Sequence, residues 1–223
     1  QYYSHPDYCT FETSSNDMIN IHSVYNNLAR DPSRLKMIVG YQKKLYNFHL
    51  DEPEEIRKQY GLLNPEDKYY TMIFSVHRAY LDLIKEELLK VFDRDEIFDE
   101  GEDDIQILRG GANQNDIENA KTRRIILTTH GYSKLGVSIK NVNSIIWAMP
   151  VASESNYIQM GGRSMRRGSN QKVVRIWIDI VDMYTPLKPQ FNQRKKIDDK
   201  RGYPISIHNE HFEDYEENEN TEE

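Results

Sequence analysis

The sequence predicts an α/β fold in which a parallel sheet carries helices on both faces. Two observations lead to this prediction: short runs of residues that are apolar throughout, and longer stretches between them with an apolar stripe at helical spacing. A strand without polar alternation is buried on both sides, which is typical of parallel sheets whose crossover connections are helices. We therefore expect strands and helices to alternate through the middle of the chain.

The expected elements follow one another between residues 70 and 181. Strands are expected at 70–76, 105–108, 124–129, 144–149 and 173–181, and helices at 79–92, 115–121 and 155–166. In parallel sheets the working residues lie in the loops after the carboxyl ends of the strands. The candidate loops are therefore 75–78, 109–113, 129–138 and the stretch from Pro150 into the next helix.

Two flanking segments place the main domain at residues 67–185. Residues 1–66 are expected to be a helical lead-in, because Asp31 offers an N-cap and Pro32 suits the first helical position ahead of an apolar stripe. Residues 186–223 are expected to form a tail that is first basic and then acidic, and flexible because it has few apolar side chains to bury.

The net charge of −7 is unevenly distributed along the chain. Residues 93–104 and 210–223 each hold eight acidic side chains, and between them these segments hold a single arginine and no lysine. The rest of the chain has 28 basic and 20 acidic residues, so its net charge is positive. Because acidic loops and tails are usually solvated, the overall negative charge does not exclude a nucleic-acid partner.

Composition argues against a secreted or membrane protein. No apolar run approaches the roughly 20 residues that span a bilayer, and the start of the chain lacks the pattern of a signal peptide. Cys9 is the only cysteine, so no internal disulfide can form. We therefore expect no membrane partner and an intracellular, reducing location. The chain begins with Gln1, and we expect it to be part of a longer protein.

The most specific pattern is the segment QMGGRSMRRG at residues 159–168. On a helix, Gln159, Arg163 and Arg166 are spaced i, i+4 and i+7 and share one face. Gly162 removes side-chain bulk between them, so that a backbone or a phosphate can approach. Two guanidinium groups on one face suit phosphate binding, because each is planar, charged and bidentate. Spacing alone leaves a second interpretation open, in which the arginines complement the negative end of a helix.

Three segments, in order, resemble motifs of superfamily 2 helicases. Residues 159–168 resemble motif VI, Q-x-x-G-R-x-x-R. Residues 128–150, TTHGYSKLGVSIKNVNSIIWAMP, resemble motif V and the strand after it, and residues 70–84, YTMIFSVHRAYLDLI, resemble motif IV. Motif V is most similar to that of phage branch-migration helicases and of transcript-release helicases of large cytoplasmic DNA viruses. The resemblance implies the C-terminal RecA-like domain of a helicase, and a viral protein of the host cytoplasm.

The resemblance implies that the motif VI residues act on nucleotide. Arg166 matches the arginine finger that reaches the γ-phosphate of ATP held by the other motor domain. Arg163 matches a second arginine directed at the phosphates, and Gln159 matches the glutamine that couples nucleotide to nucleic acid. These three are the expected catalytic residues. The expected nucleotide-binding residues are Gln159, Gly162, Arg163, Arg166, Gly136 and Ser138.

The resemblance also implies contacts with the nucleic-acid backbone. In motif V, Thr128 or Thr129 matches a threonine near that backbone, and Gly136 matches the glycine that lets the chain turn. Ser138 stands where many relatives have aspartate, so the contact made by that aspartate does not carry over. The expected nucleic-acid-binding residues are Ser75, His77, Arg78, Gly110, Gly111, Thr128 and Thr129.

ATP and Mg²⁺ are the expected cofactors, bound mainly by another domain. The sequence has no G-x-x-x-x-G-K-[ST] pattern and no Gly-Lys pair, so it lacks the phosphate loop and its Mg²⁺-binding hydroxyl. We therefore expect an N-terminal RecA-like domain as partner, and no ATP hydrolysis by this chain alone. The resemblance implies DNA as substrate, with RNA or a DNA–RNA hybrid as alternatives.

No metal site is expected in the chain itself. Residues 97–103 could suggest an acidic Mg²⁺ motif, but no buried strand leads into them. Residues 93–104 do not fit an EF-hand, because the glycine stands at the ninth position instead of the sixth. His208 and His211 lie in the acidic tail with no cysteine nearby.

Two functions from other classes remain open at this point. The chain could be a non-catalytic RecA-like module that binds nucleic acid or docks a protein, or half of a two-domain glycosyltransferase. The combination of Gln159, Arg163 and Arg166 favours the motor over both. A phosphate loop and an acidic Mg²⁺ box in sequence ahead of Gln1 would decide between them.

Overall fold

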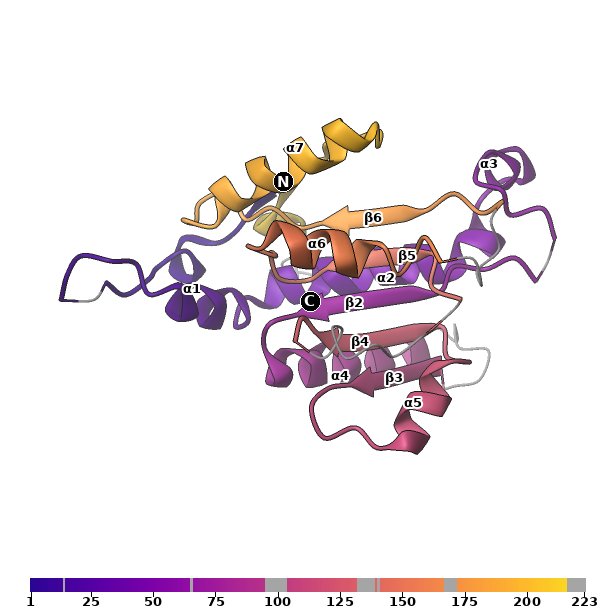
Figure 1. Cartoon of the computed structure of the whole chain (residues 1–223), viewed down its shortest axis with the longest axis horizontal. Helices are drawn as coiled ribbons and strands as arrows, with labels where there is room; N and C mark the ends of the chain where they lie inside the picture. The colour runs from indigo at the N-terminus through magenta and orange to yellow at the C-terminus, as the bar shows by residue number, and fades with distance from the viewer. Residues whose placement is uncertain are drawn as a thin grey trace, which may run out of the picture. The chain divides into compact units, whose positions relative to one another are not determined.

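The computed structural model describes residues 1–13, 15–64, 66–94, 104–131, 139, 141–166 and 172–215 (Figure 1). The chain forms two compact units. One, the sheet unit, consists of residues 39–179. The other, the terminal unit, consists of residues 1–38 together with 180–223.

Five parallel strands form the core of the sheet unit, in the order β3-β4-β2-β5-β6. Their bounds are Thr71–Ser75 for β2, Ile105–Leu108 for β3, Ile125–Thr129 for β4, Ser144–Trp147 for β5 and Ile176–Asp179 for β6. Strands β2 and β5 are buried along their whole length, as the continuous apolar runs predict. The predicted α/β fold is confirmed.

The last strand is shorter than expected. We expected a strand at 173–181, whereas β6 covers only four residues of that run. In the terminal unit, the backbone N–H of Tyr2 donates to the carbonyl of Val181, and the N–H of Met183 donates to the carbonyl of Tyr2, each at 2.9 Å. The end of the apolar run therefore pairs with a different strand, a choice of partner that its composition does not reveal.

Helices cover both faces of the sheet, since Figure 1 shows α6 in front of the strands and α4 behind them. Their bounds are Arg78–Arg94 for α4, Gln114–Ala120 for α5 and Glu154–Gly161 for α6. Helix α4 packs on β2 and β4, and α5 packs on β3. The buried apolar residues of the predicted α4 stripe, each at most 1% exposed, are Tyr80, Leu81, Ile84, Leu88 and Phe92. Helical periodicity therefore identified the packed face correctly.

Helix α2 (Pro32–Asp51) is tied to the sheet by Tyr46. The Tyr46 hydroxyl donates to the carboxylate of Asp104, just before β3. Arg124, just before β4, donates from Nη2 to the Tyr46 carbonyl at 2.7 Å, and its guanidinium lies 3.5 Å from the centre of the Tyr46 ring. The ring of Phe92 in α4 meets that of Tyr46 with centroids 5.0 Å apart. The later part of the expected lead-in helix is thus packed into the sheet unit.

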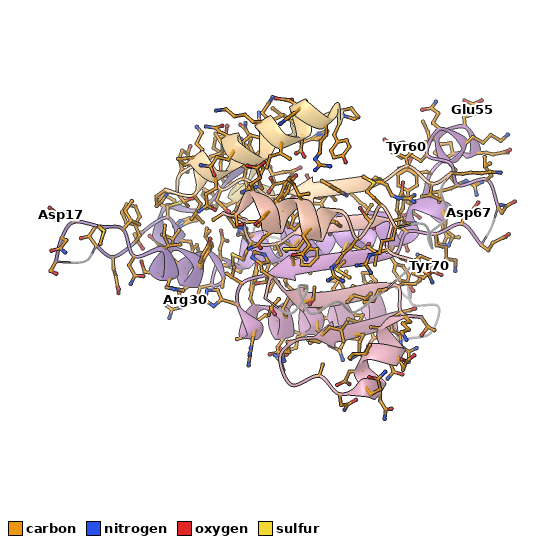
Figure 2. The ribbon with its side chains drawn as sticks, in the orientation of Figure 1. Asp17, Arg30, Glu55, Tyr60, Asp67 and Tyr70 are labelled. Atoms are coloured by element: carbon orange, nitrogen blue, oxygen red, sulfur yellow. The ribbon has the colours of Figure 1, made fainter. Side chains whose placement is uncertain are left out.

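A tight turn follows α3 (Glu54–Gln59) near the amino ends of the strands, where Figure 2 labels Tyr60, Asp67 and Tyr70. Gly61 has a φ of +73°, and a Cβ added to it would lie 1.9 Å from the carbonyl oxygen of Lys172. Only glycine combines this backbone conformation with so close an approach. The turn is therefore fastened to the segment that leads into β6.

The terminal unit brings together elements from both ends of the sequence. It contains the first part of α2, and β1 pairs in parallel with β7. The other bounds are Tyr2–Tyr3 for β1, Ile21–Leu28 for α1, Lys188–Arg201 for α7 and Glu210–His211 for β7, with short 3₁₀ turns at Pro6–Tyr8 and Phe212–Tyr215. Residues from 186, which we expected to be a tail, therefore include a helix, whereas the acidic residues 216–223 lie outside the described part of the chain.

A buried polar network organises the terminal unit. The side chains of Arg34 and Asp182 are both 0% exposed, and the guanidinium meets the carboxylate in two bonds, from Nε at 2.8 Å and from Nη2 at 3.1 Å. Asp31 caps α2 as predicted, accepting from the Arg34 N–H at 3.1 Å, and it also accepts from the Tyr2 hydroxyl at 2.9 Å. Burial raises the pKa of Asp31 above its usual range. Such a network is stabilising only while every member keeps its partner.

Among the helices that the structure describes, none has both the length and the apolar character needed to cross a membrane.

Replacing Arg34 should strongly destabilise the chain. Arg34→Met leaves the Asp182 carboxylate buried without its bidentate partner, which should cost about 3–5 kcal/mol of unfolding free energy in chemical denaturation. Lys195→Met is the matched control, because it breaks an ion pair with Asp199 whose side chains are 39% and 54% exposed, and it should cost at most about 1 kcal/mol. Equal losses for the two variants would contradict this account.

Candidate functional site

Helix α6 ends earlier than the sequence suggests. Ser153 caps its start, and the helix stops at Gly161, whereas we expected it to run to Arg166. The N–H of Gly162 still donates four residues back, to Ile158, but the three N–H groups after it each donate to a carbonyl three residues back: Arg163 to Met160, Ser164 to Gly161 and Met165 to Gly162, at 3.1–3.3 Å. This tighter 3₁₀-like turn follows two glycines, which are poor helix formers. The expected arrangement of Gln159, Arg163 and Arg166 on one face of a continuous α-helix therefore does not apply to the two arginines.

The tighter turn nevertheless keeps the arginines near each other. Residues three apart lie on the same side of a 3₁₀ turn, and Arg163 and Arg166 are three apart. Arg163 is 4% exposed and Arg166 is half-buried, while Gln159 is exposed on the helix before them. Burial, reinforced by the neighbouring charge of Arg166, lowers the pKa of Arg163 to about 10. A pKa of about 10 leaves the Arg163 guanidinium charged at neutral pH, and an anion bound next to it would relieve the repulsion from Arg166.

Strand β6 anchors the segment that carries the arginines. Ser164 is fully buried, and its hydroxyl accepts from the indole N–H of Trp177 at 2.8 Å and donates to the carbonyl of Gly161 at 2.9 Å. The Ser164 carbonyl accepts from Nε of Arg175 at 2.7 Å. The sequence pattern did not single out Ser164, Trp177 or Arg175. Their roles depend on contacts across 11 and 13 residues of sequence, which no local pattern records.

The close approach expected at Gly162 occurs at Gly161 instead. A Cβ added to Gly161 would lie 2.4 Å from the ring of Trp177, whereas one added to Gly162 would meet only the carbonyl oxygens of Ile158 and Gln159, at 3.1 and 3.6 Å. The Gly-Gly pair was the available signal, but the sequence could not tell which glycine is in contact.

The arginines do not lie at the carboxyl ends of the strands, where we expected the working residues. Helix α6 follows β5 and runs back along the sheet, so its last turn lies toward the place where β6 begins (Figure 1). The contact of Ser164 with Arg175, the residue just before β6, fixes this position. Only the start of the stretch from Pro150 lies at the carboxyl edge.

The motif IV and motif V candidates do meet at the carboxyl edge. Ser75 pairs with Thr129 in register, and Thr128 lies between Phe74 of β2 and Leu108 of β3. Thr128 is 2% exposed, so Thr129 is the threonine nearer the surface. The Ser75 hydroxyl is buried and bonds to the backbone N–H and carbonyl of His77, which shapes the turn into α4.

The glycine loop after β3 lies against the start of α4. A Cβ added to Gly110 would be 2.8 Å from Nη2 of Arg78, and Gly111 has a φ of +99°. Arg109 donates to Asp82 at 2.6 Å and to the carbonyl of Arg78 at 3.4 Å. Arg78 itself is exposed. The two exposed glycines of the loop therefore lie next to the exposed Arg78, beside the ends of β2 and β4. A guanidinium group next to accessible backbone N–H groups is suited to binding the phosphates of a nucleic-acid backbone.

Comparisons with known proteins find viral proteins that are similar to this chain in sequence. No family model matches the chain. Over 205 residues, 92% of this chain, it is 35% identical to QP509L of African swine fever virus (isolate Tick/Malawi/Lil 20-1/1983), which is named as a candidate ATP-dependent RNA helicase. The same protein from isolate Warthog/Namibia/Wart80/1980 is 33% identical over the same share. The chain spans 38% and 37% of the length of these two relatives.

Solved structures show the same fold at low sequence identity. The DUF1998 helicase MrfA, bound to DNA and AMPPNP, matches 81% of this chain and 22% of its own with a TM-score of 0.54 and 14% identity. T4 UvsW matches 95% of this chain and 40% of its own with a TM-score of 0.50 and 14% identity. The chain therefore has the fold seen in these helicases, and over most of its length it is similar in sequence to the African swine fever virus proteins.

Parts of the predicted motifs and of the acidic segment fall outside the described residues. Gly136 and Ser138 of motif V, Arg167 and Gly168 after motif VI, and most of the acidic segment 93–104 lie outside the described residues. The remaining candidates form two sets. The motif VI residues gather at the last turn of α6, and the motif IV and V residues gather at the carboxyl edge of β2, β3 and β4.

Adding a methyl group at Gly161 should destabilise the sheet unit. Gly161→Ala forces its Cβ onto the Trp177 ring, which Trp147 and Tyr157 hold at centroid distances of 6.3 and 5.8 Å, so relief requires several rings to move. The expected cost is about 1–3 kcal/mol, measured by chemical denaturation. Gly40→Ala in α2 is the matched control, because its Cβ meets nothing within 4 Å and should stabilise the helix by about 0.5–1 kcal/mol. A neutral Gly161→Ala would contradict the contact.

Proposed function

We propose that this domain is the second motor domain of an ATP-dependent nucleic-acid helicase. It supplies an arginine finger to ATP held by a first motor domain, and it supplies part of the contact with the nucleic-acid backbone. The observation that carries the proposal is the pair Arg163 and Arg166, which follow α6 and lie close enough for the charge of Arg166 to lower the pKa of Arg163.

On the nucleotide side, Arg166 is the more accessible of the two arginines. It is half-buried, so its guanidinium can contact phosphate oxygens without first being pulled from the core. Arg163 is nearly buried and adds positive charge behind it. Charge on the transferring phosphoryl group grows in the transition state, and donors already in place stabilise it best. Gln159 is exposed one turn earlier on α6, and we propose that it responds to the same phosphates.

ATP and Mg²⁺ fit this arrangement as ligands held mainly elsewhere. The two arginines can contact phosphate oxygens, but the sequence has no phosphate loop whose backbone N–H groups would bind the phosphates of ATP. ATP would supply the transferable phosphoryl group, and Mg²⁺ would neutralise its charge. We therefore propose that the chain alone does not hydrolyse ATP.

On the nucleic-acid side, Arg78, His77 and Thr129 would contact phosphates, with the backbone of Gly110 and Gly111 close by. The first three come from the ends of β2 and β4 and from the start of α4, so one edge of the sheet carries them all. Phosphate contacts carry little sequence information and weaken with salt. A translocating motor needs this kind of contact, because it must release and rebind at every step.

We retain DNA as the proposed substrate, on the resemblance of motif V to DNA-directed phage helicases. The name of the African swine fever virus relatives favours RNA. The relatives are viral, and we propose that this protein acts inside the host cell. A comparison of ATPase stimulation by single-stranded DNA and by RNA of the same sequence distinguishes the substrates. Stronger stimulation by RNA would assign RNA.

Removing the finger should reduce turnover far more than binding. In the chain joined to its first motor domain, Arg166→Ala should lower kcat for ATP by about 10³-fold or more, with KM for ATP within a few-fold. Arg166→Lys should not restore turnover, because an ammonium group lacks the planar two-donor fork. Steady-state ATPase at saturating nucleic acid measures both. A rise in KM without loss of kcat would contradict the finger.

Arg78→Ala is the matched control, because it removes the same type of side chain from the other set. We expect kcat at saturating nucleic acid to stay within a few-fold. Nucleic-acid affinity should fall, and the slope of its logarithm against the logarithm of salt concentration should decrease by about one. If Arg78→Ala and Arg166→Ala had the same kinetic effect, the division into two sets would be wrong.

A further inference from the structure

We propose that Ser164 and Trp177 are positioning residues for the motif VI arginines, a role that rests on the proposed function. Neither side chain needs to touch a ligand. They hold the short turn from Gly162 to Arg166 in the one conformation that presents both guanidinium groups together.

The first support is the number of contacts that converge on Ser164. Its hydroxyl uses both its donor and one of its acceptor positions, toward Gly161 and Trp177. Its backbone N–H donates to Gly161, and its carbonyl accepts from Arg175. Ser164 therefore links the end of α6 to β6 from both its side chain and its backbone. A backbone shift of this turn, which carries Arg163 and Arg166, would disturb these bonds.

The second support is the energetic state of Arg163. Its guanidinium is held in a desolvated position beside a second positive charge, and each of these effects disfavours its charged form. Both effects would be reduced by a relaxation of the turn that carried Arg163 into water and away from Arg166. The anchor on β6 opposes that relaxation. Holding charged donors in place before the ligand arrives is the usual source of strong transition-state stabilisation.

The third support is that Trp177 is itself fixed. Its ring meets Trp147 and Tyr157 edge-on, with interplanar angles of 88° and 84°, and Tyr157 belongs to the same helix that ends at Gly161. The indole N–H therefore donates to Ser164 from a ring whose orientation is restricted by its packing on two other rings. Gly161 lacks a side chain at the point where this ring meets the helix end.

The simpler alternative is that Ser164 is a buried hydroxyl that has found a partner, with no effect on the arginines. Trp147 allows the two to be separated. It is a second buried tryptophan that contacts Trp177, but its indole N–H has no hydrogen-bond partner among the residues that the structure describes. Trp147→Phe thus changes core packing as Trp177→Phe does, without removing a bond to the motif VI turn.

The test uses Ser164→Ala, Trp177→Phe and the double variant, in the protein that joins this chain to its first motor domain. Each single variant should lower kcat for ATP by about tenfold or more, with KM for ATP and nucleic-acid affinity within about threefold. The double variant should be no worse than the poorer single variant, because both remove the same bond. Trp147→Phe should leave kcat within about threefold.

A second readout reports on the bond itself and needs no ATP. In the 223-residue chain, Ser164→Ala should move the indole N–H resonance of Trp177 upfield and speed its exchange with solvent, whereas the Trp147 resonance should stay in place. An unchanged Trp177 resonance would overturn the bond and with it the inference.

The kinetic outcomes separate this inference from the proposed function. If Arg166→Ala abolishes turnover while Ser164→Ala and Trp177→Phe do not lower kcat, the positioning role is overturned and the proposed function stands. If Trp147→Phe lowers kcat as much as Trp177→Phe, the effect is one of core packing and the inference is also overturned. If Arg166→Ala itself leaves kcat unchanged, the proposed function fails, and the positioning role fails with it.

Discussion

The arrangement at the end of α6 places two like charges next to each other, one of them almost buried. Water would separate and solvate such a pair, so the surrounding structure must impose the arrangement. Here the end of α6 is shortened by a glycine pair, its last turn is bonded to β6 through Ser164, and β6 is held by a cluster of three aromatic rings. These features have a common effect, which is to keep Arg163 and Arg166 near each other.

The two sets of candidate residues lie at different ends of the sheet, and packed side chains connect them. Phe74, next to Ser75 at the end of β2, stacks on Trp147 with centroids 5.0 Å apart, and Trp147 meets Trp177. The path between the carboxyl edge and the motif VI turn therefore runs through the rigid core instead of a surface loop.

Local patterns in the sequence predicted the fold because each one depends on neighbouring residues. The apolar runs located all five strands, the stripe from Tyr80 to Phe92 identified the packed face of α4, and Asp31 was recognised as an N-cap. The QMGGRSMRRG segment identified the arginines. What the patterns missed depends on contacts between distant residues. At the carboxyl end of β6, the residues that we expected to continue the strand bond to Tyr2 instead. Ser164 is held by Arg175 and Trp177, which are 11 and 13 positions away in the sequence. The position of the arginines at the far end of α6 follows from the direction in which that helix crosses the sheet.

The central claim is that Arg166 completes an ATP site held by another motor domain. A crystal structure of the protein with both motor domains, bound to nucleic acid, ADP, Mg²⁺ and a metal fluoride that mimics the transferring phosphoryl group, tests it most directly. The account predicts that the Arg166 guanidinium donates to the fluoride group at a charge-assisted distance of about 2.7–2.9 Å, with Ser164 still bonded to Trp177. A closed complex in which Arg166 points to solvent, or in which another residue of the chain contacts the fluoride in its place, would contradict it.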